Sequence, residues 1–156
     1  MIIIGSDHTG IELKHNIIKY LKDKNIDVID ATNYDDQSGD DYPDRAYEIC
    51  KKVLETKDAL GIAICGTGIG ISIACNKVIG IRASVCTDKY MAKMTRQDND
   101  ANVLCLGARL ELQNVYDIVD EFISSEFAGG RHQRRVDKIT KIEECERAGV
   151  AYGNSL

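Results

Sequence analysis

Short apolar runs alternate along this chain with segments whose apolar residues recur every three or four positions. Five runs have the length and composition of strands: Ile2–Ile4, Ile26–Ala31, Gly61–Cys65, Ile81–Thr87 and Val103–Gly107. Between the runs, residues such as Leu13, Ile17 and Leu21 fall on one face of a helix. We expect helices at about 10–24 and 43–56, a third from the glycine-rich stretch to about 78, and a fourth that begins at 88. A fifth covers about 115–123 and is ended by Gly129-Gly130. A last helix carries Val136, Ile139 and Ile142.

Strands that are apolar almost throughout are typical of a parallel sheet covered by helices on both faces. The pattern therefore predicts an α/β protein: a single-domain, three-layer α/β/α sandwich, Rossmann-like, with a five-stranded parallel sheet. We expect one domain over residues 1–148 and a flexible C-terminal tail over 149–156.

Such sheets bind ligands beyond the carboxyl ends of their strands, where the strand order reverses. Asp7, His8, Cys65 and Asp88 each follow a predicted strand, so they are candidates for that edge. The loop Arg96–Asp100 is polar and precedes the fifth strand; it is either a solvated connector or, through Asp98 and Asn99, a sugar contact.

The strand at 61–65 ends in a thiol, and three alternating glycines follow it: Gly66, Gly68 and Gly70. A helix N-terminus preceded by backbone N–H groups favours anions, and a thiolate there can serve as a base or nucleophile. The alternative is a tight turn beside a buried cysteine. A dinucleotide site is a further alternative, because Asp88 falls where a ribose-binding acid would lie. Against it, the glycine spacing is Gly-x-Gly-x-Gly instead of Gly-x-Gly-x-x-Gly, and the motif follows the third strand instead of the first. No Gly-Lys-Ser/Thr follows the glycines, which excludes a P-loop.

Two polar pairs have both a structural and a functional interpretation. Asp7 either caps the next helix or accepts a ligand hydroxyl, and His8 is either a hydrogen-bonded loop residue or a ligand donor. Arg131 and Arg135 share one helix face beside Gly129-Gly130. Cations at a helix N-terminus oppose the macrodipole, so this pair suits a phosphate, which Arg109 could also contact.

Composition narrows the class of protein. The net charge of −5 disfavours a general nucleic-acid surface, and no apolar run has the length of a membrane helix. The N-terminus turns polar too soon for a signal peptide. The six cysteines form no Cys-x-x-Cys pair, so neither a zinc ribbon nor a thioredoxin motif is indicated. We expect Cys75, Cys86 and Cys105 to be buried, and a reducing, cytoplasmic location without disulfides.

Seven motifs stand together here: Gly-Ser-Asp-His-Thr-Gly (5–10), Asp-Tyr-Pro (41–43), Cys-Gly-Thr-Gly-Ile-Gly-Ile-Ser-Ile-Ala (65–74), Asn-Lys (76–77), Gly-Ile-Arg-Ala (80–83), Asn-Asp-Ala-Asn-Val-Leu (99–104) and Gly-Gly-Arg-His-Gln-Arg-Arg-Val (129–136). With them the chain closely resembles, over roughly residues 1–148, the type B ribose-5-phosphate isomerases and their relatives acting on allose and galactose 6-phosphates. The resemblance implies interconversion of ribose 5-phosphate and ribulose 5-phosphate through a cis-enediolate, in the pentose phosphate pathway. It implies no cofactor and no metal, no nucleic-acid or membrane partner, and a homodimer with sites at the subunit interface, a tetramer being left open.

By the same resemblance, Cys65 is the base, and Thr67 with the N–H groups of the loop through Gly66, Gly68 and Gly70 stabilises the enediolate. The other implied substrate contacts are Asp7, Tyr42 and Asn99 for sugar hydroxyls, His8 and Arg109 for phosphate, and Arg131 and Arg135 from the other subunit. Some relatives use a carboxylate at the position of Ile71, which is apolar here and so favours Cys65.

One position departs from the family pattern. Many relatives have a histidine, assigned to opening the furanose ring, where this chain has Asp98. A carboxylate accepts a proton but is a poor donor to the ring oxygen, so we expect Asp98 to act with a water, or His8 to share the task. Two other functions stay open: a six-carbon sugar-phosphate isomerase, and a non-enzymatic module that senses a nucleotide or sugar phosphate.

Overall fold

Five parallel strands form one sheet in the order β2-β1-β3-β5-β4 in the computed structural model, which describes residues 1–111 and 114–153. The strands are β1 (Ile2–Ser6), β2 (Val28–Asp30), β3 (Leu60–Cys65), β4 (Ala83–Val85) and β5 (Val103–Gly107). The predicted α/β class with a five-stranded parallel sheet is confirmed.

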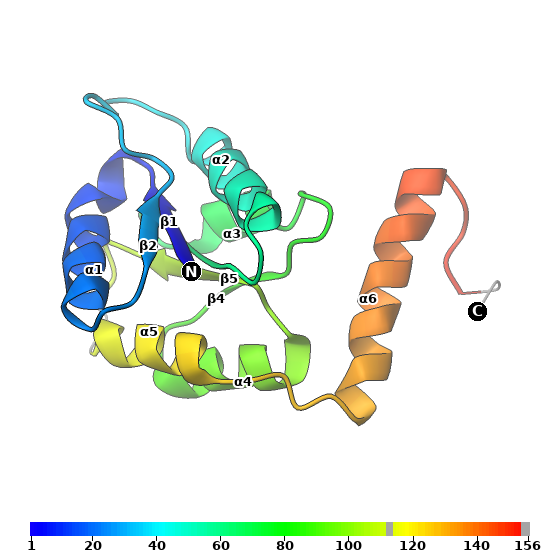
Figure 1. Cartoon of the computed structure of the whole chain (residues 1–156). Coiled ribbons are helices and arrows are strands. Elements are labelled where there is room, and N and C mark those ends of the chain that lie inside the picture. The colour runs from blue at the N-terminus through cyan, green and yellow to red at the C-terminus, as the bar shows by residue number, and fades with distance from the viewer. Residues whose placement is uncertain (112–113, 154–156) are drawn as a thin grey trace.

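Helices cover both faces of the sheet (Figure 1). They are α1 (Ile11–Asp23), α2 (Tyr42–Glu55), α3 (Ile69–Cys75), α4 (Lys89–Asn99), α5 (Val115–Ser124) and α6 (Arg131–Ala148), with a short 3-10 turn at His8–Gly10. One apolar cluster lies between the sheet and α1, α4 and α5, and the other between the sheet and α2 and α3. None of the described helices is both long and apolar enough to cross a membrane.

Alternation along β3 decides which face receives the thiol. Ile62 and Ile64 point into the cluster beneath α1, α4 and α5, whereas Ala63 and Cys65 point into the cluster beneath α2 and α3. Cys75, Cys86 and Cys105 are buried as predicted. The end of β3 therefore places the Cys65 side chain next to the N-termini of α2 and α3.

Several predicted boundaries are corrected by the structure. The edge strands β2 and β4 are shorter than expected, and α3 ends at Cys75 rather than near 78. Residues 96–99, expected in a loop, form the last turn of α4, and α5 ends at Ser124, before Gly129-Gly130. Asp88 caps α4 by accepting a hydrogen bond from the Met91 N–H at 2.8 Å, so its role in the fold is structural. Of the predicted tail 149–156, residues 154–156 lie outside the described residues.

Helix α6 stands away from the layers, joined to α5 by residues 125–130 (Figure 1). Its buried residues are Val136 and Cys145, while Ile139 and Ile142 are 45% and 44% exposed. A cavity of about 600 Å³ lies between α6 and residues 76–82, lined by Ile79, Ile81, Ile139 and Ile142 among others. The helix thus presents apolar side chains that the rest of its own chain leaves partly uncovered.

Candidate active site

Backbone hydrogen bonds join the carboxyl ends of three neighbouring strands. The Asp7 N–H after β1 donates to the Ile64 carbonyl of β3 at 3.1 Å. The Ala108 and Arg109 N–H groups after β5 donate to the carbonyls of Cys65 and Gly66, at 2.8 and 2.9 Å. The residues predicted to follow β1 and β3 are therefore held side by side, at the central strands of the sheet.

The glycine loop owes its shape to close backbone approaches. Gly68 has a φ of 81°, and a Cβ there would lie 3.0 Å from the Leu106 carbonyl carbon. A Cβ on Gly107 would lie 2.6 Å from the Thr67 backbone. Only glycine fits at both positions, so the loop lies directly against the end of β5. Thr67 stays exposed, and its Oγ1 accepts a hydrogen bond from the Ile69 N–H at 3.2 Å, at the start of α3.

Cys65 is the cysteine that opens onto this loop, with 5% of its surface exposed. Cys50 and Cys75 share its apolar cluster but lie deeper. Neighbouring thiols, Cys75 for Cys50 and Cys105 for Cys75, together with burial, raise the pKa of both groups far above the ordinary range. Those two thiols therefore stay protonated, and neither competes with Cys65 for chemistry at the loop.

Two side chains flank the loop from outside. A Cβ on Gly70 would lie 2.7 Å from Cε1 of the Tyr42 ring, which comes from the first turn of α2. A Cβ on Gly66 would lie 3.1 Å from Nη1 of Arg109. The missing side chains of both glycines let a phenol and a guanidinium pack on the loop, so the structure places Tyr42 and Arg109 against the loop that follows Cys65.

Asp7 and His8 complete the carboxyl-edge cluster. Asp7 is 5% exposed, and its Oδ1 accepts hydrogen bonds from the N–H and hydroxyl of Thr9, at 2.9 and 2.6 Å. It therefore caps the turn that follows, with one carboxylate oxygen left over for a ligand. His8 is held by Asp40, through its backbone N–H and its Nδ1, both at 2.8 Å.

Asp40 is a residue that sequence reasoning missed. Burial alone would raise its pKa, but hydrogen bonds from Arg45, Gln37 and His8 lower the pKa of this carboxyl to about 2. The hydrogen bond to Asp40 in turn raises the pKa of His8 above its usual value. The only signal in the sequence was an acidic loop before Asp41-Tyr42-Pro43, and its pairing with a residue of the first strand's loop could not be seen.

The other predicted site residues gather elsewhere. Asp98 and Asn99 end α4, and Arg131 and Arg135 begin α6. The Asp98 Oδ1 lies 3.3 Å from Nε2 of His132, a partly buried residue that sequence reasoning also passed over although it stands within the Gly-Gly-Arg-His motif. These residues form a second, separate cluster.

The second cluster lies at the opposite edge of the sheet. The Asn99 carbonyl accepts a hydrogen bond from Arg82, which precedes β4, and the Asn102 carbonyl accepts one from the Gly61 N–H near the start of β3. The six residues of β3, at about 3.3 Å each, separate the two edges by roughly 20 Å. Within one chain, the structure does not bring Asp98 and Asn99 to Cys65.

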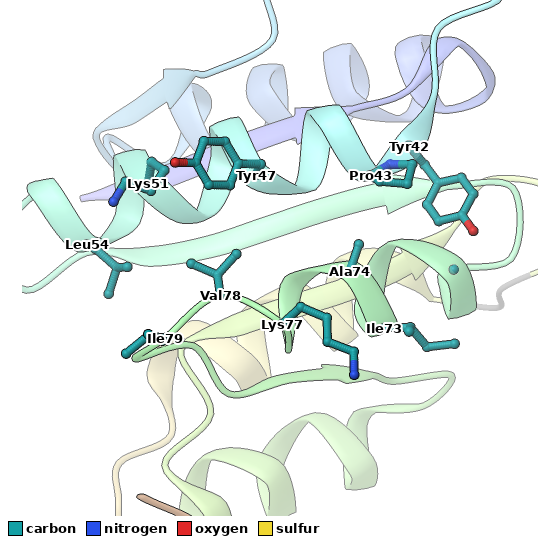
Figure 2. A pocket seen from close by; sticks show the side chains of 11 residues that line it. Tyr42, Pro43, Tyr47, Lys51, Leu54, Ile73, Ala74, Lys77, Val78 and Ile79 are labelled. Atoms are coloured by element: carbon teal, nitrogen blue, oxygen red, sulfur yellow. The ribbon is translucent and has the colours of Figure 1, made fainter. Parts of the chain in front are cut away.

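A groove of about 630 Å³ runs from the first cluster between α2 and α3 (Figure 2). Its apolar lining is unusually open: Tyr42, Tyr47, Leu54, Ile73 and Ile79 are between 41% and 59% exposed. Within the described residues, no group of three or more His, Cys, Asp or Glu side chains is arranged to hold a metal ion.

The model of the Ribose/Galactose Isomerase family matches residues 2–139 of this chain. The ribose-5-phosphate isomerase B of Escherichia coli is 45% identical over 146 residues, which cover 92% of this chain and 96% of that protein. The structure of Clostridium thermocellum ribose-5-phosphate isomerase B superposes with a TM-score of 0.86 at 49% identity, covering 93% of this chain and 98% of that one. The Mycoplasma genitalium enzyme with bound ribulose-5-phosphate superposes with a TM-score of 0.84 at 46% identity, covering 92% and 95%.

Replacing Gly70 with alanine should separate stability from ligand binding. Alanine is the better helix former by about 0.5–1 kcal/mol, so urea unfolding should show little loss of stability. The new methyl group must displace the Tyr42 ring. If that ring holds a sugar hydroxyl, as the motif resemblance implies, losing the hydrogen bond raises the Kd by about 2- to 10-fold. Calorimetric titration with ribose 5-phosphate measures that change. Ser72→Ala, in the same helix but away from the ring, is the control; wild-type affinity in Gly70→Ala would remove Tyr42 from the site.

Proposed function

The chain belongs to the ribose/galactose isomerase family, and we propose that it interconverts ribose 5-phosphate and ribulose 5-phosphate, with Cys65 as the base. The family model covers most of the chain, and the relatives named as ribose-5-phosphate isomerase B match it over nine-tenths of its length. The observation that carries the role of Cys65 is its position: the thiol ends β3 directly before the glycine loop, between Asp7 and Arg109.

The proposed reaction moves two protons and needs no co-reactant. Cys65, acting as a thiolate, takes the proton from C2 of the open-chain aldose and returns it to C1. The other proton passes from the C2 hydroxyl to the oxygen on C1, so that the carbonyl ends at C2. The enediolate between these steps carries its negative charge next to the Thr67 hydroxyl and the N–H groups of the loop through Gly66, Gly68 and Gly70, which favours the transition state.

We place the remaining contacts around the same substrate. The Asp7 carboxylate would accept hydrogen bonds from the sugar hydroxyls, and the Tyr42 hydroxyl would donate one to them. His8 and Arg109 would bind the phosphate. Arg131 and Arg135 would add bidentate contacts to that phosphate. Because those two arginines lie at the opposite sheet edge from Cys65, the full set requires a second chain.

A homodimer is therefore part of the proposal. The exposed apolar groove between α2 and α3 and the partly uncovered Ile139 and Ile142 of α6 both support a second copy docking here. In a two-fold dimer, the cluster of Asp98, Asn99, Arg131 and Arg135 from one chain would complete the site that contains Cys65 of the other.

All six cysteines carry free thiols, which fits the proposed cytoplasmic location.

Ring opening falls to Asp98 in this scheme. Its carboxylate would accept the proton of the anomeric hydroxyl, and His132, 3.3 Å away, can supply a proton to the ring oxygen directly or through a water. The pair thus provides the donor that a lone carboxylate lacks.

The wild-type protein should isomerise ribose 5-phosphate faster than allose 6-phosphate or galactose 6-phosphate, in a side-by-side comparison of kcat/KM.

Cys65→Ala should lose about 100- to 10,000-fold in kcat on the preferred substrate while still folding and binding it, because a positioned base contributes that much. Cys86→Ala, which removes a buried thiol from the other apolar cluster, is the matched control. Faster turnover of a six-carbon substrate would change the assigned reaction, and near wild-type turnover by Cys65→Ala would reassign the base.

Mixing a variant without the base and a variant without a phosphate contact should restore activity, at substrate concentrations far below the KM of the second variant, if each site is shared between chains. Cys65→Ala and Arg135→Ala, refolded together, form dimers of which about half are mixed, each with one intact site, so about a quarter of wild-type activity is expected. Cys65→Ala mixed with Thr67→Ala is the control, because both changes lie in the same half-site. Without recovery in the first mixture, the site would have to be built within one chain.

Asp98→Asn should slow ribose 5-phosphate turnover by at least about tenfold, since an amide cannot take up the anomeric proton. Asp98→His should keep much more activity, because an imidazole can both accept and donate. Steady-state rates of the two variants, with circular dichroism to check folding, make the comparison. Equal rates for Asp98→Asn and the wild type would move ring opening to another group.

A further inference from the structure

The carboxylate of Asp40 sits where four donors converge. His8 donates to Oδ1 twice, from its backbone N–H and from Nδ1, both at 2.8 Å. Arg45 Nε and Gln37 Nε2 donate to Oδ2, at 2.8 and 2.9 Å. The Asp40 side chain is only 7% exposed, so it is fixed on all sides.

This network ties a long connection back to the first strand. Gln37 Nε2 also donates to the Ser6 carbonyl, the last residue of β1, at 2.9 Å. Arg45 donates to Asp40 through Nε and to Glu48 through Nη1, both at 2.8 Å. The segment between β2 and α2 is thereby anchored beside the His8 turn, although Asp40 and His8 are 32 positions apart in sequence.

The contact selects one orientation and one hydrogen-bonding role for the His8 ring. With Nδ1 donating to a carboxylate, Nε2 is the nitrogen left to face a ligand. The side chain remains 43% exposed, so that nitrogen is accessible at the edge of the site. A carboxylate that accepts from one imidazole nitrogen fixes the orientation of the ring and favours its charged form.

The charges around His8 favour its protonated form. Asp7 and Asp40 face the ring, and Arg45 lies behind Asp40. Strand β3, which packs against the turn, contributes one titratable side chain, Cys65, and the one buried cation of α1, Lys14, is paired with Asp30 at 3.0 Å. The Asp40 hydrogen bond is the largest cause of the raised pKa of His8.

We propose that Asp40 is a positioning residue for substrate binding: it holds His8 by Nδ1, favours the imidazolium form of the ring and leaves Nε2–H for the phosphate. This inference rests on the proposed function, because it takes the ligand to be a sugar phosphate. It assigns no chemistry to Asp40, which does not touch the substrate and acts only through His8.

The pH dependence follows from the sign of the shift. The imidazolium contact is present below the pKa of His8 and is lost as the pH rises through it. Without the Asp40 charge that pKa falls, so the loss begins at lower pH. Titration of the substrate phosphate affects wild type and variant alike and cancels in the ratio of their KM values.

Asp40→Asn tests the proposal on the isomerase at pH 5.5 and pH 8. The ratio of its KM to that of the wild type should be close to one at the lower pH and rise several-fold at the higher, because the variant loses the imidazolium contact at a lower pH than the wild type does, with kcat less affected. Asp36→Asn is the matched control: it lies in the same segment, but its carboxylate accepts from Ser38, with the Ser38 N–H at 2.8 Å, and not from His8. Its ratio should stay near one throughout.

A KM ratio raised equally at both pH values would make Asp40 a purely structural residue and overturn the proposal, as would a ratio of one at both. Should Asp40→Asn fail to fold, NMR titration of the wild-type His8 ring, assigned by comparison with His8→Asn, decides the matter: a midpoint at or below 6.5 overturns it. A wild-type protein without isomerase activity would instead refute the proposed function, and the NMR midpoint would still report on Asp40.

Discussion

The site depends on a contact between two stretches of bare backbone. The loop after β3 lies on the end of β5 so closely that neither Gly68 nor Gly107 has room for a Cβ. That contact sets the direction in which the chain leaves β3, and therefore where Cys65 opens and where α3 begins. It also lets Ala108 and Arg109 donate to the carbonyls of Cys65 and Gly66, so the arginine after β5 is aimed over the loop. The placement of Cys65, Thr67 and Arg109 therefore follows from one steric constraint on two glycines.

Sequence patterns predicted the parts of the fold that burial controls. The central strands β3 and β5 were found almost to the residue, because strands covered on both faces must be apolar throughout. The edge strands were overestimated for the same reason: Ile26 and Ile81 pack into the core without joining the sheet. The last turn of α4 was missed because its residues are polar, although Arg96 and Asp100 bond to each other across that turn.

The contacts that could not be predicted are polar and distant in sequence. Lys14 lies on the same stripe as Ile17 and Leu21 but is buried, which requires Asp30 and the Thr32 carbonyl from another element. The pairing of Asp40 with His8, and of Asp98 with His132, depends likewise on where loops return to the sheet. Motif resemblance named most site residues, but it could not show that they divide between two edges of one sheet. That division emerged from the strand order and from the direction of α4.

If the proposed dimer dissociates on dilution, catalytic activity would be lost while each chain stays folded. Both apolar clusters are filled by the sheet and the helices α1 to α5, so a lone chain keeps its core whether or not α6 finds a partner. In the proposed dimer, however, its reacting half-site is complete only when another molecule contributes Arg131 and Arg135. At concentrations near the dissociation constant of such a dimer, specific activity becomes a measure of assembly and rises with protein concentration, while the fold of each chain stays the same. Expression level and local crowding would then set the activity per molecule.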